Sequence, residues 1–174
     1  MGRYRYCHHC GTATTPRMIE GRERDYCEPC RRPLYDNAKP TVGVLVTDEA
    51  GRILLLKRAI QPYFGCWDIP GGFLEADEHP EAGALREVLE ETGLEIALEA
   101  VLGHGLDHYQ AGPDPAHAHY SLVVYYRARP VGGTLAVNAE SSEAGWFAPE
   151  ALPEPEAIAF ESARELLGRL RRNP

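Results

Sequence analysis

Apolar and polar residues alternate in short stretches after residue 41, and a period of two predicts β-strands. Val42 to Thr47 and Ile53 to Lys57 are two such stretches. Asp48-Glu49-Ala50-Gly51 separates them and has the composition of a turn. This order predicts that the two strands pair as an antiparallel hairpin.

Further strands are predicted downstream, at Trp67 to Ile69, Ile96 to Leu102, Tyr120 to Ala128 and a segment ending at Trp146-Phe147. Gly112-Pro113-Asp114-Pro115 marks a long loop between two of them.

The period changes to that of a helix between Pro80 and Gly93. Proline is favoured in the first turn of a helix, and glycine is favoured just past its end. Four apolar residues recur at helical spacing and are expected to face the core: Ala84, Leu85, Val88 and Leu89. A second amphipathic helix with an Arg-rich end is predicted for Ala157 to Leu170.

Strands followed by a central and a C-terminal helix predict either an α+β fold or mixed α/β layers. The chain has 174 residues, 44% of them hydrophobic and 25% charged, which indicates one globular domain with at most a small appendage. We find neither an apolar run of the ~20 residues that span a bilayer nor a signal-like N-terminus. We therefore expect a cytoplasmic protein without a membrane partner.

The net charge of −8 is unevenly distributed. Residues 1–40 contain eight Lys/Arg and five Asp/Glu, so the remainder carries −11. An acidic body disfavours a duplex nucleic-acid binder, which needs cationic side chains against phosphate. It is compatible with carboxylate clusters that hold divalent cations.

Four of the five cysteines form two Cys-x2-Cys pairs near the N-terminus: Cys7, Cys10, Cys27 and Cys30. This spacing is typical of a structural zinc site. A pair of disulfides is the alternative, and a reducing compartment disfavours it. Residues 1–36 are therefore predicted to form a zinc ribbon that needs the metal to fold. Cys66 is expected to be a small packed residue.

Three carboxylates, Glu87, Glu90 and Glu91, share one face of the predicted central helix, because residues three and four apart are neighbours. A solvated acidic stripe is the simple explanation. However, negative charge is unfavourable near a helix C-terminus, and Gly71-Gly72 can bring backbone carbonyls close to a bound group.

Residues 72–94 carry a motif of fixed spacing, Gly72-x5-Glu78-x7-Arg86-Glu87-Val88-x-Glu90-Glu91-x-Gly93-Leu94. It resembles the Nudix box, G-x5-E-x7-R-E-U-x-E-E-x-G-U with U aliphatic, at every fixed position. The residues around the box extend the resemblance to roughly residues 41–150. The resemblance implies an α/β/α sandwich with a mixed sheet over residues 37–174. It also implies hydrolysis of a nucleoside diphosphate linked to another moiety, and homodimers are common among such proteins.

The resemblance implies roles for individual residues. Glu87, Glu90 and Glu91, with the carbonyl of Gly71, would ligate Mg²⁺ or Mn²⁺. Bound cations activate water near neutral pH, and a carboxylate can take its proton. Arg86 and Glu78 would be structural partners. Glu140 would supply a further ligand or base, with Glu143 as the competing choice.

The predicted zinc ribbon limits the choice of substrate class. The chain lacks the Ser-Gln-Pro-Trp-Pro-Phe-Pro-x-Ser stretch of NADH pyrophosphatases and resembles compact ribbon-Nudix hydrolases that cleave ADP-ribose or FAD. Arg58 is a candidate phosphate contact, and Tyr63 or Trp67 is a candidate for stacking on a base. Hydrolysis of NADH, capped RNA or RNA 5′-pyrophosphate remains an alternative. A different alternative is a ribbon that serves as a nucleic-acid or protein binding module.

Overall fold

The computed structural model describes residues 4–110 and 118–172, and its chain divides into two compact units between Asn37 and Ala38. The predicted Gly112–Pro115 loop lies outside the described residues. None of the helices in the described ranges combines the length and the apolar character that a membrane crossing requires.

The first unit is a small antiparallel sheet in the order β1-β2-β3, made of β1 (Thr15–Ile19), β2 (Arg22–Cys27) and β3 (Arg32–Leu34). Its core consists of Cys7, Cys27 and Leu34, with Tyr4 and Cys30 packed against it. So few apolar residues cannot stabilise a fold of this size by hydrophobic burial alone. The remaining stability must therefore come from the cysteine side chains.

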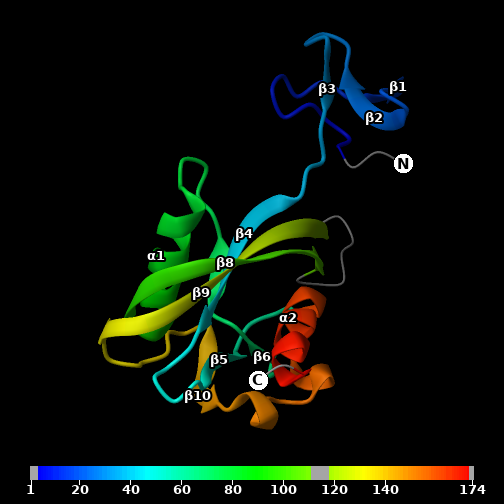
Figure 1. Cartoon of the computed structure of the whole chain (residues 1–174). Coiled ribbons are helices and arrows are strands. Elements are labelled where there is room, and N and C mark those ends of the chain that lie inside the picture. Colours follow the sequence, from blue (N-terminus) through cyan, green and yellow to red (C-terminus); the bar gives the residue numbers. More distant parts are fainter. Residues whose placement is uncertain (1–3, 111–117, 173–174) are drawn as a thin grey trace. The chain divides into compact units, whose positions relative to one another are not determined.

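The second unit contains two sheets (Figure 1). The larger has the order β7-β4-β9-β8, built from β7 (Gly71–Phe73), β4 (Lys39–Val46), β9 (His119–Gly133) and β8 (Leu94–Tyr109). Strand β4 runs parallel to β9, and the other pairs are antiparallel, so the sheet is mixed. The smaller has the order β10-β5-β6, built from β10 (Ser141–Phe147), β5 (Ile53–Arg58) and β6 (Trp67–Asp68).

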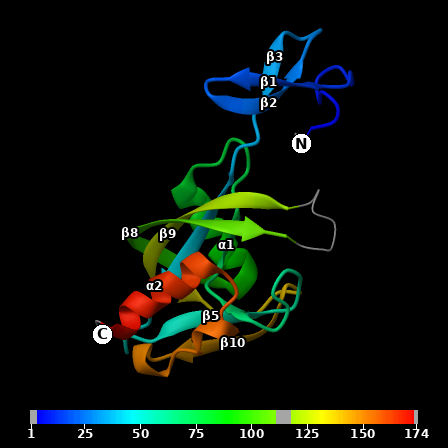
Figure 2. The same cartoon turned by 90° about the vertical axis from the view of Figure 1, so that its right-hand side faces the viewer.

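Helices α1 (Pro80–Thr92) and α2 (Glu161–Arg172) pack on opposite sides of these sheets (Figure 2). Strand β4 alternates accordingly: Val44 belongs to the cluster with α1, and Leu45 belongs to the cluster with α2. The arrangement confirms the α/β class with a mixed sheet between two helical layers. Short 3-10 turns at Pro149–Ala151 and Pro155–Ala157 precede α2.

Two sequence predictions about pairing and boundaries were wrong. β4 and β5 do not form a hairpin: they lie in different sheets and meet at the isolated bridge Thr47–Ile53. Both edges of β4 are occupied, by β7 and β9, so β5 pairs elsewhere. Helix α2 begins at Glu161 rather than Ala157, because Ala157 ends a 3-10 turn and the next residues, Ile158 and Ala159, pair with the backbone of Trp67.

The expected core face of α1 was right for Ala84 and Val88, which are fully buried, and wrong for Leu85 and Leu89, which are 42% and 50% exposed. Thr92 continues the buried row at a spacing of four residues. The face of α1 that packs on the sheet is therefore the row of Ala84, Val88 and Thr92.

Candidate active site

The ends of α1 are fixed by local signals. Pro80 occupies the first turn, and Gly93 ends the helix in the left-handed conformation (φ 68°), its N–H donating to the carbonyl of Leu89. With these ends set, the row that contains Glu87 and Glu91 lies beside the buried row. The carboxylates are thus held at the border between the core and solvent.

Strand β7 supplies the opposite wall. The N–H of Gly71 donates a 2.9 Å hydrogen bond to Oε2 of Glu91. Gly71 has φ of +155°, and a Cβ there would lie 2.1 Å from the carbonyl oxygen of Val42. A Cβ on Gly72 would lie 2.6 Å from the carboxylate of Glu87. The lack of a Cβ at Gly71 therefore lets β7 lie close to β4, and its lack at Gly72 lets the Glu87 carboxylate approach the strand.

Arg86 ties three carboxylates together. Its Nε donates to Oε1 of Glu78, and one terminal nitrogen donates to Oε2 of Glu78, both at 2.7 Å. The other terminal nitrogen reaches Glu87 at 2.8 Å and Glu90 at 3.1 Å. The guanidinium beside Glu78 lowers the pKa of that carboxyl from 4.5 to about 2. Arg86 is thus in the bidentate geometry of a positioning residue.

The electrostatics of Glu87 and Glu91 differ from those of Glu78. Burial, together with the nearby carboxylates of Glu87, Asp68 and Glu140, raises the pKa of Glu91 to about 8, although the hydrogen bond from Gly71 opposes the shift. Burial also raises the pKa of Glu87, although Arg86 opposes the shift. A divalent cation would relieve this crowding of negative charge.

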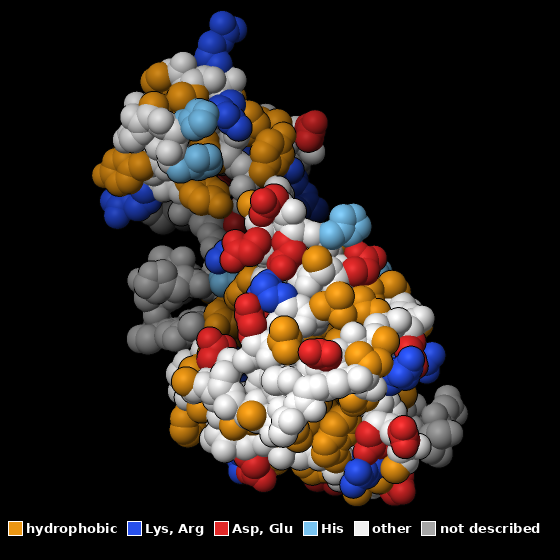
Figure 3. Space-filling model, turned by 90° about the vertical axis from the view of Figure 1, so that its left-hand side faces the viewer, with side chains coloured by type: hydrophobic (Ala, Val, Ile, Leu, Met, Phe, Trp, Pro, Cys, Tyr) orange, Lys and Arg blue, Asp and Glu red, His pale blue; other side chains and the backbone are white. Residues whose placement is uncertain are grey.

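The residues present fit such an ion. Their oxygens are the ligands that Mg²⁺ and Mn²⁺ prefer, and the carboxylates of Glu87 and Glu91 converge on the Gly71-Gly72 backbone. Glu90 is more open, with a side chain that is 56% exposed. Acidic side chains also gather across the face of the unit that carries α1 (Figure 3).

A cavity of about 270 Å³ opens beside these residues. Gly71, Gly72 and Glu91 line it together with Arg58 and Glu140. Four aromatic residues belong to the same lining: Phe73, Tyr109, Tyr125 and Phe160. The cavity therefore combines acidic and aromatic side chains.

Arg58 brings a positive charge to the lining of the cavity. Its Nε donates to the carbonyl of Pro62 at 2.9 Å, and a terminal nitrogen lies 3.4 Å from Oδ2 of Asp68. Burial raises the pKa of Asp68 to about 7, although Arg58 opposes the shift. The guanidinium also lies 5.2 Å from the centre of the Phe160 ring.

The predicted site residues are distributed unevenly around the cavity. Arg58, Gly71, Glu91 and Glu140 line it. Glu143 lies outside the lining, 56% exposed and 3.4 Å from Nζ of Lys57. Trp67 packs against Phe147 with ring centres 4.9 Å apart, and Tyr63 contacts the edge of Phe160.

The sequence analysis missed several lining residues, among them Asp68, Asp107, Tyr109 and Phe160. Asp107 and Tyr109 fall in a part of β8 that was not predicted, because that strand was ended at Leu102. The alternation of Gly105, Asp107 and Tyr109 on one face of the strand is the signal that could have identified them.

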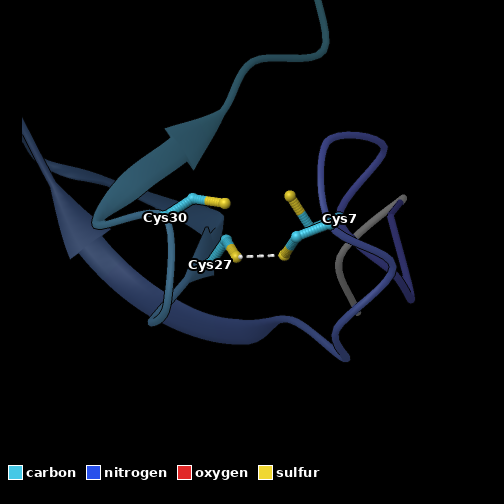
Figure 4. A group of neighbouring side chains, drawn as sticks. Cys7, Cys27 and Cys30 are labelled. Atoms are coloured by element: carbon cyan, nitrogen blue, oxygen red, sulfur yellow. Dashed lines mark hydrogen bonds between the residues drawn. The ribbon is translucent and has the colours of Figure 1, made fainter.

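The first unit holds a second candidate metal centre. The ligand atoms of Cys7, Cys10, Cys27 and Cys30 all lie within 4.8 Å of one another. Figure 4 shows the sulfur atoms of Cys7, Cys27 and Cys30 pointing toward a common centre. Tetrahedral zinc with Zn–S bonds of about 2.3 Å needs sulfur atoms about 3.8 Å apart. Hydrogen bonding with Thr12 lowers the pKa of Cys10 to about 6, which favours the thiolate. The four residues fit structural zinc.

Comparison with known proteins places these features in a family. Residues 37–168 match the model of the NUDIX domain. A Nudix hydrolase from Nitrosomonas europaea has a similar structure, with a TM-score of 0.78 and 27% identity over 98% of this chain and 92% of that one.

Two curated relatives are also similar. An ADP-ribose pyrophosphatase from Methanocaldococcus jannaschii is 31% identical over 67% of this chain and 64% of its own length. An NAD-capped RNA hydrolase NudC from Pseudomonas aeruginosa is 33% identical over 86% of this chain and 49% of its own length. The chain thus spans 64% and 49% of the lengths of these two relatives.

Proposed function

The chain belongs to the Nudix family, and from this premise we propose that it hydrolyses the phosphoanhydride bond of a nucleoside diphosphate linked to another moiety, with ADP-ribose or FAD as its substrate. The single observation that carries this proposal is the convergence of Glu87 and Glu91 on Gly71-Gly72, where both glycines and Glu91 line a cavity.

In this proposal Glu87, Glu90, Glu91 and the carbonyl of Gly71 hold Mg²⁺ or Mn²⁺. A divalent cation at this position supplies Lewis-acid polarisation of the phosphate and activation of water. An acidic protein repels the negative charge of a diphosphate. Cations held by these carboxylates would offset that repulsion.

The surrounding residues have supporting roles. Arg86 positions Glu87 and Glu90 through the contacts described above. Arg58, which lines the cavity 3.4 Å from Asp68, neutralises one phosphate of the substrate. Glu140 lines the cavity together with Glu91 and takes the proton of the attacking water.

The substrate is supported by one relative, which is named an ADP-ribose pyrophosphatase. NADH or an NAD cap on RNA is the second candidate, because the match to NudC extends over 151 residues. That length exceeds residues 38–174, so the match includes part of the ribbon. The absence of the Ser-Gln-Pro-Trp-Pro-Phe-Pro-x-Ser stretch from the sequence favours ADP-ribose or FAD.

The ribbon is proposed to hold one structural zinc through four thiolates. Four thiolates leave no open position for substrate on the metal, so this zinc has no part in the chemistry. Cysteines that hold zinc as thiolates rather than pairing in disulfides suit a reducing compartment, which supports a cytoplasmic location.

A substrate panel tests the proposal. The full-length protein is incubated with Mg²⁺ or Mn²⁺ and ADP-ribose, FAD, NADH, nucleoside triphosphates or NAD-capped RNA, and the nucleotide products are separated. We expect AMP release from ADP-ribose or FAD with the highest kcat/KM, and none from a Glu87→Gln/Glu91→Gln double variant. If no diphosphate linkage is cleaved, the proposed function is wrong. If the NAD cap gives the highest kcat/KM, the second candidate replaces the first.

A further inference from the structure

Asp68 lines the cavity, but the proposed chemistry gives it no role. Its side chain is only 14% exposed. A smaller second cavity shares Asp68 with the first, together with Arg58, Gly71 and Glu91. A carboxylate placed this deeply is costly to bury unless a cation or hydrogen-bond donors surround it. The groups that contact Asp68 therefore indicate what it does.

Two neighbours contact the carboxylate of Asp68, one at each oxygen. Oδ1 accepts a 3.0 Å hydrogen bond from the N–H of Ile69. Oδ2 lies 3.4 Å from Nη1 of Arg58, within the range of an ion pair. Because the backbone bond fixes the orientation of the carboxylate, its second oxygen is held facing the guanidinium.

The pairing of β5 with β6 brings these two charged residues together. Leu56 lies opposite Asp68 in the antiparallel ladder. Arg58 is two residues beyond Leu56, so it is the diagonal neighbour of Asp68 on the same face of the sheet. The N–H of Arg58 also donates to the carbonyl of Cys66 at 2.9 Å, which anchors the end of the strand. The ion pair is therefore built on the backbone of two paired strands.

The side chain of Arg58 is held by groups from three segments of the chain. Its Nε donates to the carbonyl of Pro62 at 2.9 Å, and its Nη1 faces Asp68 on β6. The guanidinium lies 5.2 Å from the centre of the Phe160 ring, directly before α2. Only 16% of the side chain is exposed. An arginine with these contacts has lost most of its rotamer freedom before any ligand arrives.

These contacts leave part of the guanidinium available to a ligand. Arginine carries five N–H donors, and Pro62 and Asp68 each face one of them. Within residues 4–110 and 118–172, Nη2 of Arg58 has no hydrogen-bond acceptor. Arg58 lines the same cavity as Gly71 and Glu91, so its remaining donors can serve an anion bound there.

We propose that Asp68 is a positioning residue, which holds the guanidinium of Arg58 in the orientation that contacts a phosphate of the substrate. The inference rests on the proposed function for that phosphate contact. Asp68 acts through Arg58 and does not touch the substrate, because a carboxylate in direct contact with a diphosphate would repel it.

A double-mutant cycle on nucleotide binding tests whether Asp68 acts through Arg58. The probe is α,β-methylene-ADP, whose P–C–P bridge cannot be hydrolysed, titrated with Mg²⁺ into the full-length, zinc-loaded protein by calorimetry. Asp68→Asn keeps an oxygen for the N–H of Ile69 and removes the charge beside the guanidinium. Coupled residues of one ion-pair network depart from additivity by roughly 2- to 150-fold in an equilibrium constant. We expect Asp68→Asn to weaken binding within this range, and to change it by less than twofold when Arg58→Gln is already present.

A matched variant separates this effect from the general loss of an ion pair. Asp48 is 16% exposed, pairs with Arg52 at 2.7 Å and lies outside the lining of the cavity, so Asp48→Asn should bind the probe as the wild type does. Equal weakening by Asp68→Asn with and without Arg58→Gln would overturn the proposal. Unchanged binding in Asp68→Asn, or the same loss in Asp48→Asn, would also overturn it. If Asp68→Asn fails to fold by circular dichroism, Asp68→Glu, whose extra methylene shifts the carboxylate, takes its place with the same expected and overturning results.

Kinetics supply a readout that a purely structural role would not change. At saturating Mg²⁺, Asp68→Asn should raise KM for ADP-ribose by the factor found for the probe, with kcat within threefold of the wild type, because the lost contact is one of binding. The Mg²⁺ concentration for half-maximal rate should stay the same. A raised Mg²⁺ requirement would show that Asp68 belongs to the cation site and would contradict the proposal.

The two experiments distinguish this inference from the proposed function. If the wild type cleaves no diphosphate linkage but the binding cycle is strongly non-additive, the proposed function fails and the positioning role of Asp68 stands. If the wild type cleaves ADP-ribose and the cycle is additive, the proposed function stands and the positioning role fails.

Discussion

Oε2 of Glu91 accepts a 2.9 Å hydrogen bond from the backbone N–H of Gly71, and this contact joins the last turn of α1 to strand β7. The two residues are twenty positions apart in sequence. The bond fixes one carboxylate oxygen against the sheet, which leaves the other available for a cation. It also links the end of the helix to the strand whose carbonyl is proposed as a further ligand.

Replacing Glu91 with Gln should leave the protein folded and nearly inactive. The amide retains an oxygen for the Gly71 N–H but lacks the negative charge that holds a divalent cation. Loss of about 4 kcal/mol of transition-state stabilisation corresponds to about a 10³-fold fall in kcat/KM. Steady-state kinetics with saturating Mg²⁺ measure this. Glu81→Gln, on the exposed first turn of the same helix, is the matched control and should remain near wild type. Near-normal turnover in Glu91→Gln would show that Glu91 is not a ligand of the catalytic cation.

Gly72→Ala should weaken cation binding while the fold survives. The new Cβ would lie 2.6 Å from the Glu87 carboxylate, and that flexible side chain can move aside. Displacing a ligand in this way should raise the Mg²⁺ concentration for half-maximal rate by roughly 10- to 100-fold. A titration of rate against Mg²⁺ measures the shift. Gly168→Ala, where the nearest atom is Nη1 of Arg172 at 3.7 Å, should leave the titration unchanged. An identical Mg²⁺ dependence in Gly72→Ala and the wild type would contradict the proposed ligand position.

The purified protein should contain one zinc ion per chain, and the ribbon should depend on it. The four thiols are within reach of a common centre, and metal binding contributes on the order of 10 kcal/mol to small zinc domains. Cys27→Ser should therefore lose the metal and expose β1 and β2 to trypsin, which cleaves after the Arg residues there. Metal analysis and limited proteolysis measure both effects. Cys66→Ser, outside the cluster, should retain the zinc. A zinc content near zero in the wild type purified without chelators would disprove the site.

The sequence was informative where the signals are local. Pro80 and Gly93 defined α1 because capping depends on residues within one turn, and the fixed spacing of Glu87 and Glu91 placed both on one face. The β4–β5 hairpin was predicted wrongly because pairing depends on the whole sheet: β9, some eighty residues later, takes the edge that the hairpin would need.

Contacts between distant segments were the part that could not be predicted. Tyr109 and Phe160 are fifty-one residues apart and meet only because α2 packs across the end of β8. Likewise, Asp68 becomes a buried neighbour of Arg58 only when β5 and β6 pair. Without a motif, the spacing of residues in the sequence does not predict which distant residues come into contact.

The orientation of α1 gives a stability prediction. Helical spacing put Ala84, Leu85, Val88 and Leu89 together, but only the row of Ala84 and Val88 is buried. Val88→Ala should lower the free energy of unfolding by about 2 kcal/mol, from lost apolar burial plus a small cavity. Leu89→Ala, at a half-exposed position, should change it by less than about 0.5 kcal/mol. Urea denaturation followed by circular dichroism measures both values. Equal destabilisation would indicate that Leu89 is covered in solution.

The contact between Glu78 and Arg86 should make stability depend on pH in the acidic range. Because Arg86 lowers the pKa of Glu78 from 4.5 to about 2, the folded state favours the ionised carboxylate. That stabilisation is fully present above pH 4.5 and is lost as the pH falls toward 2. Glu78→Gln should therefore have a lower urea midpoint than the wild type at pH 7, and the difference should shrink steadily between pH 4.5 and 2.

The same experiment on Glu156→Gln, at an exposed site before α2, should give no difference at either end of the range. A gap between Glu78→Gln and the wild type that stays constant from pH 7 to pH 2 would show that the side chain stabilises by packing and not by charge. A gap that closes would show that Arg86 is held by an ionised partner. Arg86 would then keep a fixed position from which to hold Glu87 and Glu90, because Glu78 accepts two of its N–H bonds at 2.7 Å.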